Sequence, residues 1–260
     1  MRRFLVLFAI GLFLIVPGAA HAATHAAAPA AAAAGGLSID FSGSGLFTDR
    51  MMQIIALITI LSVAPSILIM MTSFVRIVVV LSLLRTALGL QQSPPNSVIV
   101  SLALFLTLFV MTPTLKDAYA QGIEPLVNNQ ITTEQAFDKA AAPMKKFMLG
   151  HVRESDLKLF MNMSGTKTPP SPEATPLTTI APAFMLSELK RAFEIGFLIF
   201  VPFLIIDMAV ASILMSMGMM MLPPVIISLP FKLIFFVLVD GWKLISGSLV
   251  ESYMHGPPPG

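Results

Sequence analysis

The sequence predicts an all-α membrane protein, with about four hydrophobic helical segments in two proline-broken hairpins and a small helical extracytoplasmic domain. Of its 260 residues, 56% are hydrophobic and only 12% are charged, whereas soluble domains carry about 25% charged residues. The mean hydropathy is +0.85. Most of the chain therefore needs lipid or another protein around it.

Residues 1–22 have the three parts of a secretory signal peptide, which we expect to be cleaved. Arg2 and Arg3 form the basic end, about 13 apolar residues follow, and Ala-His-Ala at 20–22 is a small-residue cleavage site. An uncleaved anchor helix is the alternative. Cleavage lowers the count of Lys and Arg from 16 to 14, equal to the 14 Asp and Glu. A neutral mature chain without a basic stripe indicates no nucleic-acid partner.

The segments on either side of the expected folded part contain few bulky side chains. Residues 23–48 are rich in Ala and Gly with several Ser, and such a tract buries too little apolar surface to offset its loss of entropy on ordering. Residues 251–260 end in Gly and Pro. We therefore expect a disordered linker before the first hydrophobic helix and a frayed C-terminal tail.

The first hydrophobic hairpin is expected over residues 49–111. Met51–Val75 holds 25 residues without a charge, more than the roughly 20 that a spanning helix needs. Pro65 removes a backbone hydrogen bond inside this run and is expected to kink or split the helix. The Pro94-Pro95 pair marks the turn, and the second apolar run ends at Thr112-Pro113.

The charged residues gather in residues 112–192, which hold nine Lys or Arg and eight Asp or Glu. Glu134–Leu149 and Glu154–Met163 have the periodicity of amphipathic helices, and the prolines of Thr166–Pro182 predict an extended loop. A cleaved signal peptide followed by a hairpin with two crossings returns the chain outside the cytoplasm. We therefore expect a small periplasmic helical domain here.

The second hydrophobic hairpin is expected over residues 193–250, where Met208–Phe231 is uncharged and Pro223-Pro224 marks the turn. Pro202 and Pro230 are expected to break helices, and broken helices at membrane depth are tolerated only inside protein or around a water-filled cavity. The prolines therefore favour an oligomeric or channel-like assembly over a simple four-helix bundle.

The sequence contains no motif of an enzyme, a metal site or a cofactor site that we can identify. It lacks the Gly-x-Ser-x-Gly, His-Glu-x-x-His and phosphate-loop patterns, and it has no cysteine. Two histidines fall in the expected signal peptide and linker, while His151 and His255 stand apart from any carboxylate cluster. We therefore expect a protein that is not an enzyme and holds neither metal nor cofactor.

Five charged residues interrupt or border the apolar runs. Each would cost at least about 2.5–3.5 kcal/mol if it faced lipid at the centre of a helix, so we expect them to face protein, water or one another. Intersubunit salt bridges or membrane-edge anchors are the structural interpretation, and a proton relay through Asp207 is the functional one. On a continuous helix Lys232 and Asp240 would lie about 80° apart around the axis. The five residues are Arg76, Arg85, Asp207, Lys232 and Asp240.

Methionines crowd the segment that precedes the second proline pair. Because methionine is unbranched and deformable, clustered methionines can close around objects of varying shape. Composition alone favours lipid-facing or core packing for them, with a gate as the alternative. The five are Met215, Met217, Met219, Met220 and Met221.

Three stretches carry more specific patterns. They are Gln-Ser-Pro-Pro-Asn at 92–96, the segment 184–197, which begins Phe-Met-Leu-Ser-Glu-Leu-Lys, and the segment 216–242, which contains Met-Met-Met-Leu-Pro-Pro. Together they closely resemble the FliP family of the flagellar type III export gate. The likeness covers about residues 50–252, and the third stretch is the most specific.

The resemblance implies a multi-pass protein of the bacterial inner membrane at the flagellar basal body. Family members assemble as a ring, thought to be pentameric, with the small membrane proteins FliQ and FliR, and the complex exports unfolded flagellar subunits. A methionine-rich loop closes the pore, which implies a gate at Met219, Met220 and Met221. The resemblance also implies contacts with other flagellar export proteins and helical hairpins largely lifted out of the bilayer plane.

Two other functions remain open on the residues alone. A small-solute or ion transporter would need a selective site near the midplane of the membrane, for which Asp207 is the candidate. A non-conducting scaffold of the secretion machine would tolerate substitution at Met219–Met221.

Overall fold

The computed structural model describes residues 46–165, 172–219 and 221–254, and the regular structure of these ranges is helical throughout. The expected signal peptide, nearly all of the expected linker and the last residues of the tail lie outside the described residues. Met52–Gly260 forms one compact unit. The all-α fold class is confirmed.

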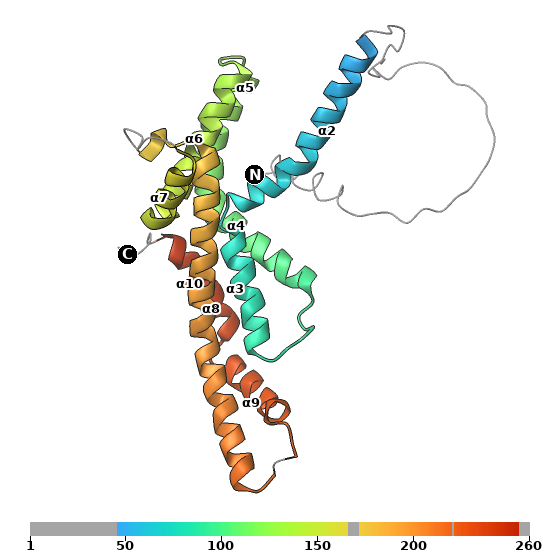
Figure 1. The fold of residues 1–260 in the computed structure, drawn as a ribbon, viewed down its shortest axis with the longest axis vertical. Coiled ribbons are helices and arrows are strands. Elements are labelled where there is room, and N and C mark those ends of the chain that lie inside the picture. The colour runs from blue at the N-terminus through green and yellow to red at the C-terminus, as the bar shows by residue number, and fades with distance from the viewer. Residues whose placement is uncertain (1–45, 166–171, 220, 255–260) are drawn as a thin grey trace, which may run out of the picture. The chain divides into compact units, whose positions relative to one another are not determined.

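Figure 1 shows the order of the helices along the chain. Two helical stretches, Asn96–Val127 and Leu177–Ser216, are long and apolar enough to cross a membrane, and α9 with α10, bent by 61° at their junction, makes a third candidate. The described residues thus hold two or three candidate spans, where the sequence predicts about four hydrophobic segments. The helices are α2 (Leu46–Met70), α3 (Phe74–Ala87), α4 (Asn96–Ala118), η1 (Tyr119–Ile123), α5 (Glu124–Val127), α6 (Thr133–His151), α7 (Glu154–Met163), η2 (Pro172–Ala174), α8 (Leu177–Ser216), α9 (Pro224–Leu238) and α10 (Gly241–Met254).

The first hydrophobic run divides later than predicted. α2 remains helical through residue 65 and ends at Met70, and α3 begins at Phe74. At the break, the Thr72 hydroxyl donates to the carbonyl of Ile69 at 2.8 Å and accepts from the backbone N–H of Phe74 at 3.4 Å. A hydroxyl that bonds nearby backbone groups in this way competes with the helix, so the division falls here rather than at Pro65.

The turn predicted at the first proline pair is confirmed. α3 ends at Ala87, Gly89 follows with a φ of +80°, and Pro95 immediately precedes α4. The guanidinium of Arg85 holds this turn, because its Nη1 donates to the carbonyl of Pro94 at 3.2 Å and to Oδ1 of Asn96 at 2.6 Å.

Single prolines do not end the long helices, which corrects the breaks predicted at Pro202 and Pro230 and the end of the first hairpin predicted at Pro113. α4 continues through Pro113, α8 through Pro202 and α9 through Pro230. In apolar surroundings water cannot replace lost backbone bonds, so losing one bond at a proline is less unfavourable than opening the helix. The argument for a channel from broken helices therefore does not apply.

The expected charged segment is not separated from the hydrophobic hairpins by a helix break at either of its boundaries. The boundaries expected at 111/112 and 192/193 both fall inside continuous helices, α4 and α8. α8 already begins at Leu177, so the last part of the expected proline-rich loop is helical. The two amphipathic helices predicted between these boundaries are confirmed as α6 and α7.

The main core forms around α3, which packs against both α4 and α8. Ile77, Val80, Leu81 and Leu84 of α3 are fully buried in it. Gly196 of α8 lies so close to α3 that a Cβ atom added there would be 2.3 Å from Cδ1 of Leu83. α3 and α8 therefore approach each other closely at Gly196.

A glycine-to-alanine substitution tests the packing of η1 on α6. A Cβ at Gly122 would lie 2.6 Å from the Ala136 carbonyl oxygen and 2.6 Å from Cβ of Ala140. Since the helix backbone cannot yield as a flexible side chain can, we expect Gly122→Ala to lower the free energy of unfolding by about 1–3 kcal/mol. Thermal unfolding of the protein in detergent measures this.

The matched control is Gly150→Ala, because Gly150 is also helical and a Cβ there meets nothing within 4 Å. This variant should be as stable as the original chain or gain up to about 1 kcal/mol from helix propensity. Equal stability of the two variants would contradict the close packing of η1 on α6.

Candidate functional site

The most distinctive polar and apolar features meet in the hairpin of α8 and α9. α8 ends at Ser216, α9 begins at Pro224, and residues 217–223 join them. Pro224 occupies the first turn of α9, where its missing N–H removes no helical bond. The second predicted proline-pair turn is therefore confirmed.

The connecting loop, residues 217–223, exposes methionines at the tip of the hairpin. Gly218 has a φ of +74°, a conformation that favours glycine and turns the chain out of α8. Met219 is 40% exposed and Met221 is 98% exposed. Met220 lies outside the described residues. Two of the three predicted gate methionines thus project from the hairpin rather than pack in its core.

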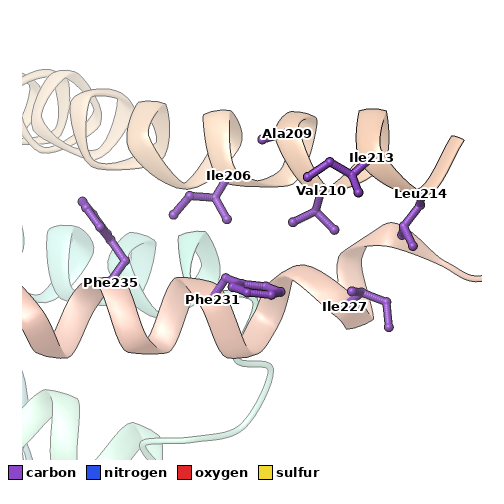
Figure 2. Close-up of a pocket in the computed structure, with 8 residues that line it drawn as sticks. All are labelled: Ile206, Ala209, Val210, Ile213, Leu214, Ile227, Phe231 and Phe235. Carbon is purple, nitrogen blue, oxygen red and sulfur yellow. The ribbon is translucent and has the colours of Figure 1, made fainter. Parts of the chain in front are cut away.

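An apolar cleft of about 470 Å³ lies between the two arms of the hairpin. Figure 2 shows side chains of α8, such as Ile206 and Val210, pointing toward α9, and Phe235 of α9 pointing back. The full lining is Ile206, Ala209, Val210, Ile213, Leu214, Ile227, Phe231 and Phe235.

A partly buried ion pair joins the same two arms. Lys232 of α9 is 4% exposed, and its Nζ lies 2.7 Å from Oδ2 of Asp207 on α8. The hydroxyl of Ser228 donates to the other carboxylate oxygen, Oδ1. Lys232 also donates to the carbonyl oxygen of Ala87, at the end of α3, at 3.3 Å. Three helices therefore meet at one ammonium group.

A second ion pair, which is fully buried, lies near the start of α3. Arg76 of α3 and Glu188 of α8 are 1% and 0% exposed, and Nε of Arg76 donates to Oε2 of Glu188 at 2.9 Å. From α10, the Tyr253 hydroxyl donates to Glu188 and Ser252 Oγ lies 3.1 Å from Nη1 of Arg76. The guanidinium carbon also sits 3.9 Å from the centre of the Tyr253 ring.

Comparison with known proteins decides the family of the chain. The sequence model of the FliP family matches residues 57–249. The chain belongs to the FliP family. The flagellar biosynthetic protein FliP of Caulobacter vibrioides is 62% identical over 215 residues, which cover 83% of this chain and 80% of that protein.

Two further relatives extend the match. The Bacillus subtilis protein of the same name is 57% identical over 201 residues, or 77% of this chain and 91% of that protein. The Agrobacterium fabrum protein is 45% identical over 255 residues, covering 97% of this chain and 100% of that protein. The hairpin and both ion pairs fall within the range that the FliP family model matches, whereas Ser252 and Tyr253 of α10 lie just beyond it.

The structure brings together only one pair of the five charges selected from the sequence. Asp207 and Lys232 meet, whereas Arg76 pairs with Glu188, and Arg85 bonds the α3–α4 turn. Asp240 is exposed at the junction of α9 and α10, with a φ of 51°. It therefore lies off the end of α9 and not on one continuous helix with Lys232.

Sequence reasoning missed Glu188, Ser228 and Tyr253. Glu188 is 112 positions from Arg76 and falls in a segment expected to face water, so no local pattern linked the two. Across the described residues, no group of three or more His, Asp or Glu side chains could hold a metal ion. The polar groups of the site are thus arranged as paired charges and hydroxyls.

Loss of Glu188 should be among the most destabilising single changes. We expect Glu188→Leu to lower the free energy of unfolding by about 3–5 kcal/mol, because it leaves the Arg76 guanidinium buried without its counter-ion. The double variant Arg76→Leu/Glu188→Leu removes both charges and should recover most of that loss. Denaturant unfolding of the detergent-solubilised variants measures both effects.

The control for this cycle is the exposed pair Lys190–Glu194 on the same helix, whose charged atoms lie 3.8 Å apart. Exposed pairs contribute about 0–1 kcal/mol, so Glu194→Ala should change stability little. A Glu188→Leu variant as stable as the Glu194→Ala variant would contradict the assigned role of the buried pair.

Proposed function

We propose that this chain is a core channel subunit of the flagellar type III protein export gate. In this proposal several copies form a ring, with a pentamer as the expected form, and the ring conducts unfolded flagellar subunits across the inner membrane. The relatives carry the name flagellar biosynthetic protein FliP, which supports a role in building the flagellum. The proposal assigns conduction to the chain, and no catalysis.

The observation that carries the proposal is the exposed methionine tip of the α8–α9 hairpin. Met221 is 98% exposed, a high value for a large apolar side chain in a packed molecule. Deformable thioethers from several copies, converging on one axis, would seal a pore and still yield to chains of different shape. We therefore assign the gate to Met219, Met220 and Met221.

The outer surface of α8 supports assembly with other apolar surfaces. Large apolar side chains along it are exposed, and contiguous exposed apolar surface marks contact with protein or membrane. FliQ-like and FliR-like subunits and further copies of this chain are the proposed protein partners, together with other flagellar export proteins. The exposed residues include Phe193, Phe197, Leu198, Leu204, Ile205 and Met208.

We place the assembled protein in the bacterial inner membrane, as a multi-pass protein at the flagellar basal body. Its signal peptide is proposed to be cleaved, and the segment around α6 and α7 to face the periplasm. The candidate spans Asn96–Val127 and Leu177–Ser216 support a membrane location.

The assembly state can be tested by native mass. Tagged protein extracted in mild detergent should run as a ring, and its mass should increase when FliQ-like and FliR-like proteins are co-expressed. A stable monomer or dimer under both conditions would contradict the ring and favour a small-solute or ion transporter. Asp207, the candidate site for that alternative, is already paired with Lys232.

The gate can be tested by replacing Met219, Met220 and Met221 together with Ala. Because Ala is too short to fill the pore that the methionines close, we expect cells with the assembled variant to leak ions and small solutes. Influx of a small dye or of ions, divided by the amount of assembled complex, measures the leak.

The control variant is Met163→Ala/Met254→Ala, which truncates exposed methionines at the ends of α7 and α10, outside the α8–α9 hairpin. It should assemble and remain tight. Wild-type influx in the triple variant would remove the gate assignment and favour a non-conducting scaffold.

A further inference from the structure

The ammonium of Lys232 is a junction between the proposed gate hairpin and the α3–α4 part of the core. It comes from α9 and binds Asp207 of α8 at 2.7 Å and the carbonyl oxygen of Ala87 at 3.3 Å. Lys232 is buried, while the Asp207 side chain is about one third exposed, at 34%. The lysine, which belongs to α9, is thus the more buried partner of the contact, and its ammonium bonds α3 and α8 at the same time.

Ser228 makes the junction directional. It lies four residues before Lys232, so both side chains project from the same face of α9. Ser228 bonds Oδ1 of Asp207 while Lys232 bonds Oδ2. Two bonds from successive turns of α9 to the two oxygens of one carboxylate fix both the rotation and the axial position of α9 against α8.

The rest of the contact between the arms is apolar. Toward the tip, α8 and α9 face each other across the cleft lined by side chains such as Val210, Leu214 and Ile227. Apolar contacts are not directional, so they permit sliding and rotation. Among the described residues of the two helices, the hydrogen bonds that join one arm to the other all end on Asp207.

The contact with Ala87 links the hairpin to α3. The last carbonyls of a helix have no partner inside the helix, and a cation there is favourable because the helix dipole places partial negative charge at this end. Ala87 is the last residue of α3, and the turn that follows is held by Arg85. A shift of this turn would therefore act directly on Lys232.

We propose that Lys232, with Asp207 and Ser228, is a positioning site that holds the methionine loop in its closed place and couples it to the end of α3. These residues act through the α8–α9 hairpin and not by touching the transported chain. This inference rests on the proposed gate at Met219–Met221. Displacement of the α3–α4 turn is then the movement that would release the hairpin.

The decisive variant is Lys232→Met/Asp207→Asn, which removes both charges without leaving one buried alone. Replacing a buried ion pair by neutral groups of similar volume is often tolerated, so the ring should still assemble. If the pair serves only stability, such a ring stays tight. If it positions the gate, ion influx per assembled complex rises toward that of the triple methionine variant. Wild-type influx would overturn the inference.

Lys232→Arg and Asp240→Asn are the controls. Arginine keeps the charge and can donate to both the carboxylate and the Ala87 carbonyl. The ion influx per assembled complex of Lys232→Arg should therefore stay at the wild-type level. Asp240 is an exposed acid just after the C-terminal end of α9. The ion influx of its amide variant should equal that of the wild type. Leak from Lys232→Arg equal to that of the neutral double variant would contradict the charge-based junction.

Ser228→Ala keeps the test decisive if the double variant does not assemble, because it leaves the ion pair intact and removes one bond to Asp207. Influx between the wild-type and triple-variant levels supports the junction, and wild-type influx overturns it. The triple methionine variant is measured in parallel. If it stays tight, the gate itself fails, whereas a leaking triple variant beside a tight double variant rejects the junction alone.

Discussion

The arrangement of the helices depends on one requirement: a charged side chain buried among apolar helices needs a partner of opposite charge in direct contact. Arg76 is 1% exposed, and its guanidinium is satisfied by Glu188, Ser252 and the ring of Tyr253. These partners come from α8 and α10, so the three helices must meet wherever the arginine is buried. A buried ion pair adds little net stability over an apolar pair, but breaking it is severe. The pair therefore selects one arrangement of helices.

The second ion pair repeats this constraint at the other end of α3. Arg76 lies near the start of α3, and the Ala87 carbonyl bound by Lys232 lies at its end. On α8 the corresponding acids, Glu188 and Asp207, are nineteen residues or about 28 Å apart along the helix. Between the two polar contacts the interface is close-packed and apolar. α3 is thus tied to α8 at both ends, and the hairpin tip extends beyond the second of these contacts.

Local patterns in the sequence predict local structure well and pairing poorly. The amphipathic periods of α6 and α7 and the two proline pairs were sufficient to place those helices and turns. Single prolines gave wrong predictions of helix breaks, because in apolar surroundings a helix continues through a proline and loses only one backbone hydrogen bond. The spacing of Lys232 and Asp240 was misleading for a different reason: the chain turns at Asp240, with a φ of 51°. Glu188 lies 112 positions from Arg76, so no local sequence pattern around Arg76 predicts that the two side chains pair.

The hairpin separates two physical tasks that one surface could not perform together. A seal that admits chains of different shape needs side chains that deform and contacts without direction, as methionines and the apolar cleft provide. Such contacts alone would leave the position of the loop undefined. A carboxylate that accepts from two successive turns of α9 supplies the missing direction. Because this contact lies along the arms of the hairpin and not in the loop, it can fix the position of the tip without stiffening the tip itself. In the proposed gate, closure and compliance therefore depend on different residues and can be altered independently.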